Sequence, residues 1–100
     1  MLKHVIVEAG KTRKKRKPIR FMFMMKGEEI LGYVLARSKN HFEYFVTTEN
    51  GYEQVKGGSI GWHVQDMCTR KGLTQQDVYN YFGVTRFSML IWACKQELRD

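Results

Sequence analysis

The segment from Lys71 to Lys95 constrains this chain most, because it predicts two helices joined by a tight turn. Thr74 is a favourable N-cap residue, and Asp77 stands three residues later in the capping-box position. Gly83 is placed to end the first helix, since glycine tolerates a positive φ. Thr85 can cap the second helix. Two helices with a short glycine turn between them predict a helix-turn-helix.

The packing of these two helices follows from their apolar residues. The inner faces are expected to consist of Val78, Phe82, Val84, Met89 and Trp92. The outward face of the second helix then carries Phe87, Leu90 and Ile91, which is apolar for a surface that reads DNA. Tyr79 stands at the expected closest approach of the helices, so we expect it to splay them or to point outward. Two ordinary core helices separated by a glycine stop are the alternative interpretation.

The run GLTQQDVYNYFGVT resembles the helix-turn-helix of lambda-repressor/Cro-type regulators, whose pattern is G-L-T-Q-x-x-(apolar)-A-x-x-(apolar)-G-V-(S/T). The matching residues are Gly72, Leu73, Thr74, Gln75, Val78, Phe82, Gly83, Val84 and Thr85. The resemblance covers about residues 61–96 and departs from the pattern at Tyr79, where the family usually has alanine. It implies a phage, plasmid or bacterial transcriptional regulator that binds double-stranded DNA as a homodimer.

In that reading the start of the second helix enters the major groove. Arg86 reaches guanine edges, Ser88 serves either base type, and Phe87 touches thymine methyl groups. The amino end of the first helix holds phosphate. The full set of expected DNA-binding residues is Gln75, Gln76, Thr85, Arg86, Phe87, Ser88 and Lys95.

Positive charge is concentrated in the run from Lys11 to Lys17. The net charge of the chain is +7, and six of its 17 basic residues lie in this run, which leaves eleven basic against ten acidic residues elsewhere. Such a block predicts contact with nucleic acid phosphates and steep salt dependence. The expected phosphate-binding residues are Lys11, Arg13, Lys14, Lys15, Arg16, Lys17 and Arg20. A solvated loop or a nuclear localisation signal would have the same composition.

The segments before residue 58 alternate like β-strands. Strands are expected over residues 2–8, 18–25, 29–37, 41–48 and 52–56, with tight turns between most of them. A further helix is expected over 60–71, capped by Ser59. The fold class is therefore α+β: an N-terminal antiparallel meander of three or four strands, then three helices with the helix-turn-helix. We expect a single domain, 1–100, with a sheet part (1–58) and a helical part (59–100).

Six aromatic residues lie on the expected strands, namely Phe21, Phe23, Tyr33, Phe42, Tyr44 and Phe45. Most simply they form the core beneath the helices. On an open sheet they would instead stack on unpaired bases, which makes an RNA or single-strand binder an alternative function. A second alternative is an adaptor or inhibitor that binds a host protein through the apolar face of the last helix.

No constellation for catalysis or metal binding is evident. The histidines His4, His41 and His63 are scattered, and no Cys-x-x-Cys or His-x-x-x-His spacing occurs. Cys68 and Cys94 fit small core residues in a reducing compartment. No stretch approaches the length of a membrane span. We therefore expect a cytoplasmic protein that is not an enzyme and needs no cofactor or metal.

Overall fold

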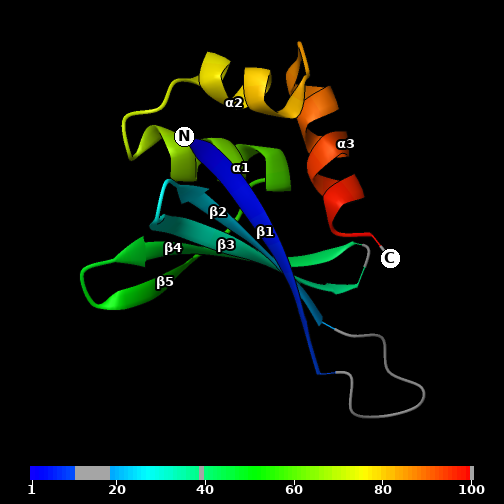
Figure 1. Ribbon diagram of the computed structural model, residues 1–100. Helices are drawn as coiled ribbons and strands as arrows, with labels where there is room; N and C mark the ends of the chain where they lie inside the picture. The colour runs from blue at the N-terminus through cyan, green and yellow to red at the C-terminus, as the bar shows by residue number, and fades with distance from the viewer. Residues whose placement is uncertain (11–18, 39, 100) are drawn as a thin grey trace.

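The computed structural model describes residues 1–10, 19–38 and 40–99 and consists of an antiparallel sheet covered by three helices (Figure 1). The strands are β1 (Leu2–Ala9), β2 (Ile19–Lys26), β3 (Glu29–Ser38), β4 (His41–Thr48) and β5 (Gly51–Val55). The helices are α1 (Ile60–Thr69), α2 (Gln75–Phe82) and α3 (Phe87–Glu97). The strand order is β1-β2-β3-β4-β5. The α+β class is confirmed, and the sheet has five strands because β1 pairs with β2 along its whole length.

One face of the sheet forms the core with the helices. Alternate residues of β2, β3 and β4 point to this face, as the period of two in a strand requires. They pack against α1, whose Ile60, Val64 and Met67 are almost completely buried. The strand residues in the buried core cluster are Met22, Met24, Leu31, Val34, Ala36, Tyr44 and Val46. The prediction that Cys68 and Cys94 belong to the core is confirmed, since both are free and fully buried.

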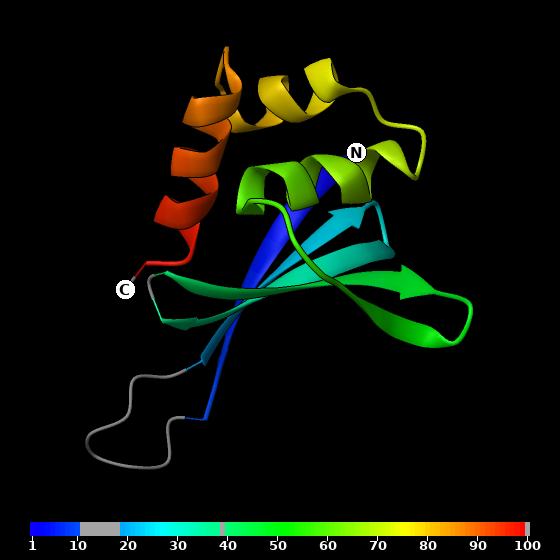
Figure 2. The same cartoon turned by 180° about the vertical axis from the view of Figure 1, so that it is seen from behind.

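All three helices lie on the same side of the sheet, as the two opposite views show (Figures 1 and 2). The other face has no helix over it in the described part of the chain. No helix among the described residues is long and apolar enough to cross a membrane.

The expected caps of the first two helices are confirmed. The Ser59 hydroxyl accepts a hydrogen bond from the Trp62 N–H at the start of α1. Thr74 and Asp77 form the reciprocal capping box of α2. The Thr74 N–H donates a hydrogen bond to the Asp77 carboxylate, which lowers the Asp77 pKa from its usual value. Gly83 ends α2 in the left-handed conformation with φ of 69°.

The prediction for Thr85 was wrong, and one of the two alternatives for Tyr79, an outward orientation, is contradicted. The N-cap of α3 is Arg86, without a side-chain cap, and the Thr85 hydroxyl lies one position too early and contacts the Met89 sulfur instead. Tyr79 does not point outward. It is buried, and its hydroxyl accepts a 2.8 Å hydrogen bond from Gln75 Nε2.

The prediction of which side of α3 faces inward was also wrong. Leu90 and Cys94 are fully buried, whereas Met89 and Trp92 are 40% and 63% exposed. The inward residues are spaced by four positions and form one stripe along the helix with Leu98. The helix is thus turned by about one residue, or 100°, from the expected orientation.

Close contact with α1 explains this orientation. Ile91 packs against Gly61, where an added Cβ would lie 2.7 Å from Ile91 Cγ1. The absence of a side chain at Gly61 lets α3 approach α1 through Ile91. The expected outward apolar face of Phe87, Leu90 and Ile91 therefore does not exist as a unit, because Leu90 is buried and Ile91 is partly buried.

Gly32 is expected to be the least replaceable glycine of the sheet. Its φ is 155°, and a Cβ would lie 2.4 Å from the backbone oxygen of Phe45 and 2.6 Å from the sulfur of Met67. Gly32→Ala should lower the free energy of unfolding by about 3 kcal/mol, because the backbone cannot move away. Urea denaturation measures this loss. Gly61→Ala is the matched comparison. It should cost less because its closest obstruction, Ile91 Cγ1, belongs to a side chain and not to the backbone, and because Gly61 does not have a positive φ; an equal or smaller loss for Gly32→Ala would contradict this expectation.

Candidate nucleic-acid interface

The open side of the sheet carries a continuous group of aromatic rings, which we call the aromatic face. Its members are Phe21, Phe23, Tyr33, Phe45 and Tyr52. The register explains the group: Phe23 lies opposite Tyr33, and Tyr33 lies opposite Phe45, so their side chains share one face. Met22 and Val34, which alternate with these residues, point to the helices instead.

Tyr33 is the centre of the aromatic face. Its ring centroid lies 4.7 Å from that of Phe45 with nearly parallel planes, and 5.0 to 5.7 Å from those of Tyr52, Phe23 and Phe21. These separations are typical of favourable aromatic pairs. Burial raises the Tyr33 pKa, with smaller contributions from Tyr52 and Glu43. The phenol therefore stays neutral, and the rings form an uncharged surface.

The aromatic face is open at its edges. Tyr52 at one edge is 47% exposed, and Val5 and Val7 at the other are 43% and 42% exposed. Val7 lies opposite Phe21 in the register, which makes β1 part of the same surface. An apolar group of this size on an open sheet is typical of an interaction site.

The predicted basic run lies outside the described residues, but the structure describes the strands that precede and follow it. Lys11, Arg13, Lys14, Lys15, Arg16 and Lys17 connect β1 to β2. The flanking Ala9 and Ile19 are paired at the end of that hairpin, and Phe21 follows two residues later. The main source of positive charge is therefore joined to the strands that carry the aromatic face.

Arg20 was expected to bind phosphate with this run, but its described contacts point to the helix side of the sheet. Its guanidinium forms an ion pair with Glu8 at 3.1 Å and donates a hydrogen bond to the backbone oxygen of Arg99. Arg20 thus ties β2 to the carboxyl end of α3. The structure does not bring it to the aromatic face.

The residues expected to read DNA separate into two places. Thr85, Arg86, Phe87 and Ser88 are exposed around the α2–α3 turn, and Gln75 and Gln76 are exposed in the first turn of α2. Figure 1 shows this end of the molecule far from the sheet and from the hairpin that leads into the basic run. Lys95 lies farther along α3, beside Trp92 and apart from the others.

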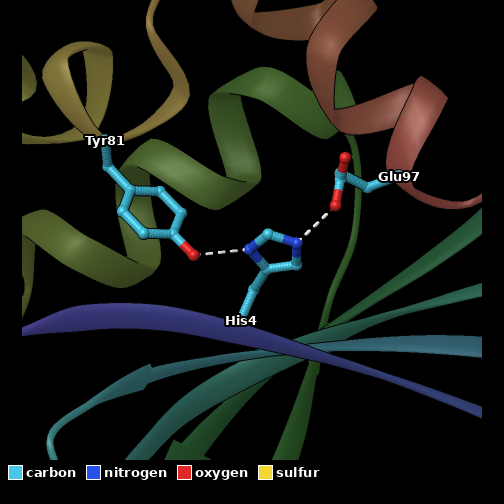
Figure 3. Close-up of polar contacts among 3 residues, drawn as sticks. All are labelled: His4, Tyr81 and Glu97. Atoms are coloured by element: carbon cyan, nitrogen blue, oxygen red, sulfur yellow. Dashed lines mark hydrogen bonds and ion pairs between the residues drawn. The ribbon is translucent and has the colours of Figure 1, made fainter.

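A hydrogen-bonded cluster of three side chains, which the sequence gave no reason to expect, joins β1 to two helices (Figure 3). His4 Nδ1 lies 2.6 Å from the Tyr81 hydroxyl, and His4 Nε2 lies 2.5 Å from Glu97 Oε1. The His4 ring also stacks on Phe82 at 6.0 Å. The partners are 77 and 93 residues away in sequence, so no local pattern could reveal them.

The chemistry of this cluster favours a structural role, so we call His4, Tyr81 and Glu97 the clasp. In the tautomer that satisfies both contacts, Tyr81 donates to Nδ1 and Nε2–H donates to Glu97. Burial raises the Tyr81 pKa, and Glu97 raises it further while the contact with His4 opposes both. The phenol therefore stays protonated, which does not suit a nucleophile.

Breaking the clasp should loosen β1 selectively. Tyr81→Phe removes one hydrogen bond and should lower the free energy of unfolding by about 1 kcal/mol. His4→Ala also removes the ring packing and should cost about 2 kcal/mol. Hydrogen exchange should show the greatest loss of amide protection in β1. Arg70→Ala, which removes the exposed ion pair with Asp66, is a control expected to have little effect. Uniform loss of protection across the sheet would argue against a local clasp.

No group of three or more potential metal ligands occurs in residues 1–10, 19–38 and 40–99. Burial raises the pKa of both Cys68 and Cys94 to about 12, so these thiols are neutral. Comparison with protein-family models, curated proteins and solved structures finds no match for this chain.

Proposed function

We propose that this chain binds single-stranded nucleic acid, with successive bases stacked on the aromatic face. The observation that carries the proposal is the cluster of five rings on the uncovered side of the sheet, centred on Tyr33. Base–aromatic stacking contributes about 1–3 kcal/mol per base and requires unpaired bases. A duplex keeps its bases stacked on one another, so it cannot use this surface.

Charge favours nucleic acid over a second copy of the chain. Two copies would bring together two surfaces that each carry the excess of the +7 net charge in the connected basic run. A polyanionic strand has the opposite charge, and the six cations of the run that connects β1 to β2 in sequence would favour contact with its phosphates. The only ion pair that the described residues form across this face, Arg37 with Glu43 at 2.6 Å, is internally neutral.

The deciding experiment compares labelled single strands of deoxythymidine and uridine with a random duplex by fluorescence anisotropy at two salt concentrations. Single strands should bind at least tenfold more tightly than the duplex, and the affinity should fall steeply with salt. Neutralising Lys14, Lys15 and Arg16 to glutamine should reduce the salt slope by about two to three, since each phosphate contact contributes about 0.7 to the slope. Tighter duplex binding, or dimerisation without binding, would overturn the proposal.

The second candidate is a transcriptional regulator that reads double-stranded DNA through α2 and α3. Its support is the exposure of Arg86 and Ser88 at the start of α3 behind a left-handed Gly83. This candidate is the weaker one because the start of α3 lies far from the hairpin that leads into the basic run (Figure 1), and that run contains most of the excess positive charge. Arg86→Ala should relax sequence preference in duplex binding if this candidate is correct. An unchanged sequence preference in the Arg86→Ala protein would contradict this second candidate.

A further inference from the structure

A small polar pocket lies between α3 and the β3–β4 turn, on the helix side of the sheet. It has a volume of about 270 Å³ and is lined by Asn40, Trp92, Lys95, Gln96 and Arg99. Trp92 is 63% exposed and is the most open large aromatic side chain among the described residues. Lys95 follows Trp92 by about one helical turn, and Arg99 lies just after the end of α3. The indole and both cations therefore border the same pocket.

Among the described residues that line the pocket, the two charged ones, Lys95 and Arg99, are both cations. The carboxyl end of a helix carries a partial charge of about −0.5, which two full positive charges exceed. Glu97, the nearby acid on α3, is directed to His4 on β1 and holds it at 2.5 Å. The Arg20 hydrogen bond to the backbone oxygen of Arg99 fixes the chain just after the helix. The lining therefore favours an anionic ligand, and the Trp92 indole adds an aromatic surface on which a ring of that ligand can stack.

We propose that this pocket binds one nucleoside phosphate. The base stacks on the Trp92 indole, Lys95 and Arg99 bind the phosphate, and the amides of Asn40 and Gln96 contact the base edge. The volume lies just below the usual range of small-molecule pockets, about 300–1,000 Å³, so it suits one nucleotide rather than several. Base–indole stacking and charge-assisted phosphate contacts are the standard means of recognising this chemistry.

The position of the pocket links it to the aromatic face. Figures 1 and 2 both place the carboxyl end of α3, the β3–β4 turn, the end of β1 and the start of β2 at the same end of the molecule. A strand bound on the aromatic face can leave the sheet there and place its next nucleotide against Trp92. This source of the ligand rests on the proposed function; a free nucleotide is the other source of the same chemistry.

Tryptophan fluorescence tests the pocket directly. The chain has two tryptophans, so the Trp62→Phe protein reports only on Trp92. Adenosine and uridine monophosphate, or a phosphorylated oligonucleotide, should quench Trp92 saturably. Lys95→Gln with Arg99→Gln in the same background should weaken the binding that the quenching measures at least tenfold. The nucleosides alone and inorganic phosphate should likewise bind at least tenfold more weakly.

The arms of this experiment separate the two sources and the two proposals. Quenching by free nucleotide supports a nucleotide pocket, and quenching by the oligonucleotide alone supports a subsite for a bound strand. Absence of quenching by both would overturn the inference, as would equal binding of inorganic phosphate. Tyr33→Leu should lower the affinity for the strand roughly 5- to 150-fold and leave quenching by free nucleotide intact. Trp92→Leu removes the fluorescent reporter, so titration calorimetry follows this variant: it should lose binding of the free nucleotide and keep strand binding. Failure of the aromatic face and failure of the pocket therefore give different results.

Discussion

Replacing both Tyr33 and Phe45 by leucine is expected to abolish most single-strand binding while the protein stays folded. Leucine keeps an apolar side chain on the aromatic face but has no π-surface for a base. Loss of one stacked base costs about 1–3 kcal/mol, so each substitution should lower the affinity roughly 5- to 150-fold. Fluorescence anisotropy with a labelled strand measures the loss, and thermal unfolding confirms that both proteins are folded at the assay temperature.

The matched control for this variant is Phe42→Leu. Phe42 lies on β4 like Phe45, but it packs against the core on the helix side of the sheet. Its replacement should also reduce stability, because part of a ring that packs against the core is lost. Its strand affinity should be unchanged. Equal loss of affinity in the Phe42 variant, or none in the Tyr33 and Phe45 variant, would show that the rings do not stack on bases.

Acidification is expected to destabilise this protein through one buried histidine. His63 on α1 is fully buried, its ring stacks on Tyr44 at 4.8 Å, and neither nitrogen has a hydrogen-bond partner of good geometry. Burial lowers the His63 pKa from 6.5 to about 4, and the nearby backbone of Tyr33 and Phe45 opposes this only in part.

The direction of the pH effect follows from proton linkage. Between pH 6.5 and 4 the unfolded chain binds a proton at this histidine and the folded chain does not. The contribution of neutral His63 is therefore fully present above pH 6.5 and declines as the pH falls through this window. A pKa difference of this size corresponds to about 3 kcal/mol, which is a large part of the stability of a small domain.

Urea denaturation between pH 7 and 4.5 measures this decline. His63→Leu removes the titrating group and should flatten the profile over the window, although the loss of the ring contact with Tyr44 lowers stability at pH 7. His41→Gln, at the exposed start of β4, is the control and should retain the decline. A wild-type profile without a decline, or the same decline in both variants, would refute the role of His63.

Much of the fold was predictable because it depends on local chemistry. The alternation in β2 placed Met22 and Met24 on one face and Phe21 and Phe23 on the other, as the structure confirms. Thr74, Asp77 and Gly83 predicted the start and end of α2, because capping involves neighbours in sequence. The candidate site was less predictable: the aromatic residues were identified, but their simplest interpretation as core beneath the helices was wrong for Phe21, Phe23, Tyr33 and Phe45.

The sequence by itself determined the helices and strands, the alternation of the strands and the position of the positive charge, because each of these depends on residues that are close together in the chain. Only the tertiary structure decided which face of the sheet the helices cover. β3 is apolar on both sides, so its own pattern does not indicate which face is buried. The packing of α1 against the sheet decides it. Contact between Gly61 and Ile91 likewise sets the orientation of α3, and the clasp of His4 with Tyr81 and Glu97 joins residues that meet only in the folded chain.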